Sequence, residues 1–267
     1  MLLVLDIGNT GILLGVFDLE GSGELLSNWR LSSSKKRTAD EYGIALLGLL
    51  SSGKTCNNRE GLDFRDKITG VAISCVVPEL HRTLTLAITQ SLGITPLVIG
   101  PGIKTGIPIL TDDPREVGSD RIVNAVAAFN AHKCALIIVD MGTAITLDYI
   151  TEKGEYAGGV IAPGILISAE ALFGRAARLP RVEIESPPHV IGKNTADCMR
   201  SGLHYGFASL IDGMIKRIKK ETNSSPKVVA TGGQVGLIAA KETCKEIDVI
   251  DEFLVLKGLR IIYEANK

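Results

Sequence analysis

The sequence predicts an α/β protein made of two tandem halves that share one plan. Short apolar runs typical of strands alternate with helical patterns along the 267 residues. An acidic Asp-x-Gly turn follows an apolar strand near the start of the chain, at residues 6–10 (DIGNT). A second one follows an apolar strand at residues 140–144 (DMGTA). Each turn leads directly into another β-rich run, so we divide the chain into residues 1–130 and 131–267.

In the first half, apolar runs predict strands and amphipathic stretches predict helices. The expected strands are residues 2–5, 12–17, 29–31, 70–77 and 96–99, and the expected helices are residues 38–50, 79–92 and 121–132. Thr38, followed three residues later by Glu41, has the pattern of a capping box. Residues 53–63 are polar and loop-like. Residues 100–117 are rich in Gly and Pro, which predicts a long connection of the kind that is usually functional.

The second half repeats the alternation. The expected strands are residues 135–139, 144–149, 158–161 and 227–230, and the expected helices are residues 168–178, 196–220 (one helix or two), 235–240 and 258–266. Ser168 is the expected cap of the first of these helices. Only the acidic turn matches the first half closely in sequence.

Composition narrows the class of protein and its partners. Apolar residues make up 45% of the chain and charged residues 22%, as in ordinary globular proteins. The net charge of −1 gives no long-range attraction to nucleic acid or to an anionic membrane. The five cysteines include no CxxC pair, which argues against zinc and disulfide frameworks and favours reduced thiols in a cytoplasmic protein. No stretch approaches the roughly 18 apolar residues that cross a bilayer.

The two acidic turns together predict a phosphate-binding site. Gly lets the backbone approach a ligand closely, and turn N–H groups with a Thr or Asn side chain can donate to phosphate oxygens. The Asp suits a cation held against the phosphate. Thr231-Gly232-Gly233, after an apolar strand, can admit a flat base and ribose. Ordinary hairpins and a plain strand-to-helix turn remain the alternatives, and the chain has neither a P-loop nor a GxGxxG motif.

A second candidate region joins the long connection to a helix. Asp120 falls near the helix start, where a carboxylate is either a cap or a proton acceptor for a substrate hydroxyl. Arg121 beside it can bind a substrate carboxylate through two hydrogen bonds.

These elements resemble one family along the whole chain, the type III pantothenate kinases. The strings that carry the resemblance are DIGNT (6–10), RTADEYG (37–43), GPGIKTG (100–106), DPREVGSDRIVNAVAA (113–128), DMGTAITLD (140–148), GEYAGGVIAPG (154–164), IGKNTADCMRSG (191–202) and ATGG (230–233). The resemblance implies two actin-like, ribonuclease-H-like α/β domains, each a mixed sheet flanked by helices, with a nucleotide cleft between them. It also implies transfer of the ATP γ-phosphate to the primary hydroxyl of pantothenate, which gives 4′-phosphopantothenate for coenzyme A synthesis.

The resemblance also implies roles for single residues. Asp120 is similar to the family's proton acceptor, and Asp140 to its ligand for a monovalent cation, K⁺ or NH₄⁺. Asp6 is expected near Mg²⁺. The implied ATP contacts are Asp6, Ile7, Gly8, Asn9, Thr10, Gly11, Ile12, Leu13, Thr143, Thr231, Gly232 and Gly233, and the implied pantothenate contacts are Gly118, Ser119, Asp120, Arg121 and Thr195. The Thr195 contact comes from the neighbouring subunit in this family, which implies a homodimer with the site at the subunit interface.

Four positions depart from the family's usual residues: Gly11, Thr111, Ser119 and Met141. Thr111 stands where a substrate-contacting Tyr is common, and Gly11 follows the first turn, where Asn or His is usual. Three other functions are compatible with an ATP cradle. They are a nucleotide-binding regulatory protein, a sugar or acetate kinase, and an actin-like filament protein. Asp120 next to Arg121 disfavours the first, and the GPGIKTG loop with residues 118–121 disfavours the second.

Overall fold

A computed structural model describes residues 1–21, 23–51, 62–176, 178–238 and 243–267, so most of the expected loop at 53–63 lies outside the described residues. Contacts divide the chain into two compact units. Unit 1 contains residues 1–106, 115–127 and 255–267, and unit 2 contains residues 107–114 and 128–254. The predicted boundary near residue 130 falls close to the change of unit at 127–128. Residues 255–267, however, pack in unit 1.

Unit 1 is built on a five-stranded mixed sheet. Its strands are β1 (Leu2–Ile7), β2 (Gly11–Phe17), β3 (Leu25–Ser32), β4 (Gly70–Cys75) and β5 (Leu97–Val98), in the order β3-β2-β1-β4-β5. The first three form an antiparallel meander, whereas β4 is parallel to β1 and β5 is parallel to β4. The carboxyl ends of β1 and β4 therefore meet at one edge of the sheet, where ligands commonly bind in α/β folds.

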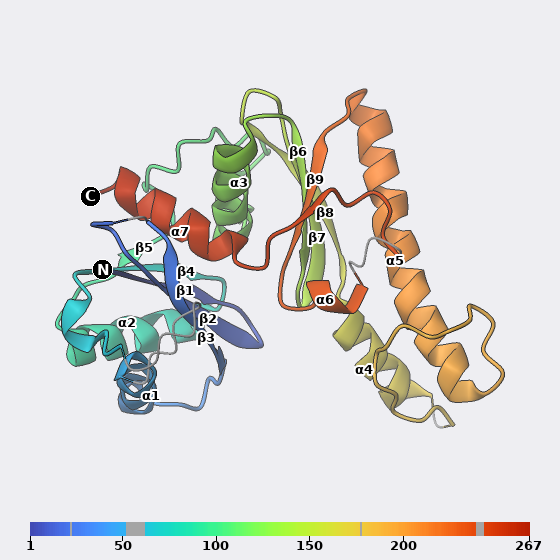
Figure 1. Cartoon of the computed structure of the whole chain (residues 1–267), viewed down its shortest axis with the longest axis horizontal. Helices are drawn as coiled ribbons and strands as arrows, with labels where there is room; N and C mark the ends of the chain where they lie inside the picture. The colour runs from blue at the N-terminus through green and yellow to red at the C-terminus, as the bar shows by residue number, and fades with distance from the viewer. Residues whose placement is uncertain (22, 52–61, 177, 239–242) are drawn as a thin grey trace. The chain divides into compact units, whose positions relative to one another are not determined.

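Helices cover both faces of this sheet. The helices α1 (Ala39–Ser51) and α2 (Pro78–Leu92) pack together against the face that carries Leu3, Leu5 and Ile7. The other face is covered by α7 (Leu254–Ala265), since a side chain at Gly15 would meet Leu256 (Figure 1). The early part of α3 (Ser119–His132) packs against α7 at Val123 and Gly258.

Unit 2 repeats the sheet. Its strands are β6 (Leu136–Met141), β7 (Ala144–Ile150), β8 (Tyr156–Pro163), β9 (Lys227–Thr231) and β10 (Val249–Ile250), in the order β10-β9-β6-β7-β8. Its helices are α4 (Ile165–Arg175), α5 (Thr195–Thr222) and α6 (Val235–Ile238). They pack on the face that carries Ile137, Val139 and Met141, and α5 runs beside the sheet (Figure 1).

The two sheets have the same topology. Read from the other end, β8-β7-β6-β9-β10 matches β3-β2-β1-β4-β5 strand for strand, including the antiparallel meander and the parallel neighbours. Asp6 and Asp140 are each the fifth residue of the central strand. Side chains alternate along a strand, so both carboxylates lie on the face opposite the apolar cluster of their unit. The predicted tandem α/β plan is confirmed.

Most expected elements are present, with one informative difference at Ser168. The capping box at Thr38 forms as predicted, since Glu41 Oε2 accepts from Thr38 N at 2.7 Å and Thr38 Oγ1 accepts from Glu41 N at 3.3 Å. The prediction for Ser168 is wrong, because α4 begins at Ile165 and its N-cap is Gly164. The region after 195 is one helix of 28 residues, capped by Asn194. Across the described residues, no helix has the length and apolar character needed to span a bilayer.

Candidate active site

The first acidic turn lies at the carboxyl end of β1 in unit 1. Gly8 N donates to Gly11 O at 3.0 Å, which closes the turn. Asn9 and Thr10 at its tip are exposed to solvent, as a phosphate-binding tip needs to be. Asp6 on β1 and Leu13 on β2 are register partners. The predicted segment from Asp6 to Leu13 is therefore one strand–turn–strand unit.

Ser33 supports this turn from the neighbouring strand. Its hydroxyl donates to Gly8 O at 2.6 Å, and its N–H donates to Thr10 O at 3.3 Å. Sequence reasoning missed Ser33, because its contact with the turn depends on how β2 and β3 pair. The residue directly follows β3, and the hairpin register places the end of β3 beside the start of β2.

Asp120 occupies the first turn of α3, as predicted. Its Oδ1 accepts a hydrogen bond from Arg121 N at 2.8 Å. A Cβ atom at Gly118 would lie 2.5 Å from the same oxygen, so the carboxylate folds back over Gly118. Asp120 and Arg121 are both partly exposed and remain accessible to a substrate.

Contacts within unit 1 link this segment to the first acidic turn. Asp6 and Ser74 are register partners in the parallel pair β1–β4. Ser74 Oγ lies 3.0 Å from Ser119 Oγ, in the residue before Asp120. The structure therefore brings the magnesium candidate Asp6 and the proton-acceptor candidate Asp120 to the same face and the same edge of one sheet.

Cys75 is a neutral neighbour of this edge. Burial raises the pKa of its thiol, and the nearby Asp6 charge raises it further. The thiol donates a hydrogen bond to Val77 O at 3.2 Å. The thiol is therefore protonated at neutral pH and adds no negative charge beside Asp6.

The second acidic turn lies at the equivalent place in unit 2. Gly142 N donates to Ala144 O at 3.0 Å, so this turn also closes on its Gly but is one residue shorter than the first. Gln234 N donates to Met141 O at 2.9 Å, which ties the segment after β9 to the turn. Gly232 has a φ of +102°, and a side chain there would collide with Asp140 Oδ1. Asp140 and the Thr231–Gly233 segment, predicted separately, thus lie against each other.

Gly164 closes the same turn from a third side and was missed by the sequence analysis. Its N–H donates to Thr143 O at 3.1 Å, and a Cβ atom there would collide with the carbonyl oxygens of Gly142 and Thr143. The start of α4 can therefore approach the turn only because residue 164 is Gly.

Comparison with known proteins gives the family. The profile of the type III pantothenate kinases matches residues 2–217. This chain belongs to the type III pantothenate kinase family. A type III pantothenate kinase of Geotalea uraniireducens (strain Rf4) is 51% identical over 267 residues, covering 100% of this chain and 99% of that protein. The family member from Moorella thermoacetica (strain ATCC 39073 / JCM 9320) is 51% identical over 266 residues, covering 100% of both chains.

Solved structures of low sequence identity share the fold of this pantothenate kinase family member. A glucokinase of the ROK family from Streptomyces griseus, solved with glucose and AMPPNP, matches with a TM-score of 0.55. It covers 99% of each chain at 13% sequence identity, so the likeness concerns the fold alone.

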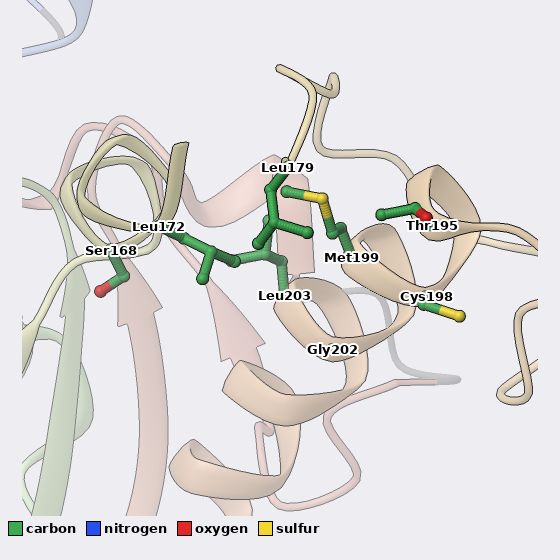
Figure 2. Close-up of a pocket in the computed structure, with 8 residues that line it drawn as sticks. All are labelled: Ser168, Leu172, Leu179, Thr195, Cys198, Met199, Gly202 and Leu203. Atoms are coloured by element: carbon green, nitrogen blue, oxygen red, sulfur yellow. The ribbon is translucent and has the colours of Figure 1, made fainter. Parts of the chain in front are cut away.

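Thr195 belongs to a different part of the kinase. As the first residue of α5, it lines a groove of about 450 Å³ between α4 and α5 (Figure 2). The other lining residues are mostly apolar: Ser168, Leu172, Leu179, Cys198, Met199, Gly202 and Leu203. None of these other lining residues is a predicted site residue.

Proposed function

We propose that this chain transfers the γ-phosphate of ATP to the primary hydroxyl of pantothenate, with Asp120 as the proton acceptor. The observation that carries the proposal is the position of Asp120, held over Gly118 in the first turn of α3 and linked through Ser119 and Ser74 to the edge that carries Asp6. Family membership favours this reaction over a purely regulatory role.

In this reaction the pantothenate hydroxyl oxygen bonds to the γ-phosphorus while the bond from that phosphorus to the β–γ bridging oxygen breaks, and ADP leaves. The hydroxyl proton passes to the Asp120 carboxylate. Catalysis of this kind depends chiefly on positioning and charge stabilisation. Arg121 is proposed to bind the pantothenate carboxylate, with Gly118 and Ser119 as neighbouring contacts, because a guanidinium matches a carboxylate through two parallel hydrogen bonds.

Unit 1 is proposed to hold the phosphates of ATP along residues 6–13, with Mg²⁺ near Asp6. No cluster of three or more His, Cys, Asp or Glu side chains able to hold a metal occurs in the described part of the chain. One carboxylate at the turn nevertheless fits Mg²⁺, which commonly takes one or two carboxylates together with substrate phosphates and water. When bound, Mg²⁺ neutralises charge that develops on the phosphates.

Unit 2 is proposed to hold a monovalent cation at Asp140, a phosphate at Thr143 and adenosine along residues 231–233. Asp140 fits a monovalent cation, since its carboxylate lies near a backbone carbonyl, Met141 O, and carbonyl oxygens can replace the hydration shell of K⁺. The small residues after β9 leave room for the nucleoside.

An assay of ADP release tests this function. We expect ADP to form only when ATP, Mg²⁺ and pantothenate are all present, and to form faster in potassium or ammonium than in sodium. The matched control is the same mixture without pantothenate, which measures ATP hydrolysis. If the rate of ADP release in potassium does not respond to pantothenate, the proposal is wrong.

A homodimer is proposed through the α4–α5 surface. Exposed apolar side chains gather there: Leu166, Ile167 and Leu172 on α4, and Val190 and Ile191, which are 66% and 83% exposed. The loop before α5 is held in place by the helix, since Tyr205 Oη donates to Pro187 O at 3.0 Å, Ser201 Oγ to Val190 O, and Cys198 Sγ to Gly192 O at 3.4 Å. A fixed apolar surface of this kind is typical of an interface.

We propose that a second copy of this chain covers this surface. Thr195 lines the groove between α4 and α5, and the family resemblance assigns its pantothenate contact to a neighbouring subunit. A two-fold interface would use the same surface on both copies. A cytoplasmic location is also proposed, since Cys75, Cys134, Cys198 and Cys244 are all free thiols.

The variant Ile191→Asp tests the dimer. We expect it to sediment as a monomer and to raise KM for pantothenate, because a buried, unpaired carboxylate opposes association and the Thr195 contact is lost. Ile44→Asp is the matched control, as Ile44 is 73% exposed on α1 of unit 1. A wild-type monomer, or an Ile191→Asp dimer, in sedimentation velocity would contradict the proposal.

A further inference from the structure

Ser74 occupies an unusual position at the ligand-binding edge of unit 1. It is fully buried, at 0% exposure, near the carboxyl end of β4. Its register partner on β1 is Asp6, and paired residues in a sheet direct their side chains to the same face. That face is the one on which α3 and α7 pack, so the Ser74 hydroxyl is directed toward the start of α3.

The Ser74 hydroxyl makes its hydrogen bond to the first residue of that helix. Ser74 Oγ and Ser119 Oγ lie 3.0 Å apart, and Ser119 immediately precedes Asp120. The path from Asp6 to Asp120 thus consists of one step across the sheet, one hydrogen bond and one peptide unit. The side chain of Val76 also lies near this segment, since a Cβ atom added at Gly118 would be 3.7 Å from Val76 Cγ1.

The repeat shows that this arrangement has a counterpart in unit 2. There the register partner of Asp140 is Thr231, which is 2% exposed. In both units, therefore, a buried hydroxyl residue on the parallel neighbouring strand stands beside the acidic residue. Thr231 leads into the Gly232 turn that packs on Asp140, whereas Ser74 reaches across to a helix.

We infer that Ser74 is a positioning residue for phosphoryl transfer, because its hydrogen bond to Ser119 fixes the Asp120 carboxylate relative to Asp6. The inference rests on the proposed roles of Asp6 and Asp120. The acceptor hydroxyl and the γ-phosphorus must come within about 3–3.5 Å in a set orientation, and a displacement of about 1 Å can cost about 10²-fold in rate. A hydrogen bond between two side chains that are otherwise packed in the fold limits such displacement.

A double-mutant cycle tests the inference with Ser74→Ala, Ser119→Ala and the double variant in the full-length enzyme. We expect each single variant to lower kcat by about 10- to 100-fold. The double variant is expected to be no slower than the slower single variant, because both changes remove the same bond. KM for ATP and the melting temperature are expected to stay close to the wild-type values, which separates positioning from loss of structure.

Ser27→Ala is the matched control. Ser27 is also a fully buried strand serine of unit 1. It pairs with Val16 on β2, and Val16 pairs with Leu3 on β1, so Ser27 lies near the opposite end of the sheet from Asp6. We expect this variant to keep the wild-type kcat.

Three outcomes would overturn the inference. The first is that the losses of kcat in the two single variants add up in the double variant. The second is a Ser74→Ala kcat equal to that of Ser27→Ala, and the third is a lower kcat accompanied by an equally marked fall in melting temperature. A failure of the proposed function is recognised separately. In that case wild-type enzyme forms no ADP in response to pantothenate, and the role of Ser74 falls with it.

Discussion

Replacing Asp120 with Asn is expected to lower kcat by about 10²–10⁴-fold, the usual contribution of a well-placed general base. The change removes the negative charge and the proton-accepting capacity but keeps the shape. The amide oxygen of Asn can still accept from Arg121 N, as Asp120 Oδ1 does at 2.8 Å, so the first turn of α3 should be preserved. Steady-state kinetics and a calorimetric titration with a non-hydrolysable ATP analogue measure the two expected effects, slow turnover and unchanged nucleotide affinity.

Asp40→Asn provides the same chemical change in an equivalent setting. Asp40 lies in the first turn of α1 and is exposed, whereas Asp120 lies in the first turn of α3 and is partly exposed. We expect the Asp40 variant to turn over at the wild-type rate. A kcat for Asp120→Asn that matches that of the Asp40 variant would remove Asp120 from its proposed role.

The second large effect is expected at Gly232. The replacement Gly232→Ala places a methyl group against Asp140 Oδ1 and 2.6 Å from both Met141 N and Met141 O, at a φ of +102° that L-residues rarely adopt. The backbone strain alone costs about 1–3 kcal/mol. The collision must also displace Asp140 or the β9 turn. We therefore expect a lower free energy of unfolding, a loss of ATP affinity and a weaker response to potassium.

Gly236→Ala is the control, four residues further along. Gly236 lies in α6, and a Cβ atom there would meet nothing within 4 Å. Ala in a helix is favoured over Gly by up to about 1 kcal/mol, so this variant should be as stable as the wild type or more so. Chemical denaturation of both variants checks the difference. Equal stability and equal ATP affinity would show that the Gly232 turn tolerates a side chain.

Local patterns in the sequence were sufficient to predict much of this fold. The capping box at Thr38 and Glu41 requires only residues three apart, and it forms as expected. The two acidic turns were recognisable because each follows an apolar strand. Each also contains an Asp, a Gly and a hydroxyl or amide residue within five positions. The family's sequence patterns added the expected roles of Asp120 and Asp140, which no periodicity could supply.

The features that the sequence did not reveal depend on contacts between distant segments. Ser168 looked like a helix cap, but Gly164 takes that place because the start of α4 must press against the backbone of residues 142–143. No local pattern singles out Ser33, and only the β2–β3 register brings it to Gly8. Residues 255–267 looked like part of the second half, because nothing local indicates that Leu256 packs over Gly15.

The position of α7 also has a consequence for the order in which the protein can fold during synthesis. All five strands of the unit 1 sheet are made before any strand of unit 2, but the helix that covers one face of that sheet is made after β10. Tyr263 of this helix packs against Gly70 on β4, and Arg260 lies over the Phe17 ring. While the ribosome is still making unit 2, unit 1 has an uncovered apolar face of the kind that promotes aggregation. Unit 1 can therefore complete its folding only after residues 255–267 have emerged, which is after the last strand of unit 2 has been made.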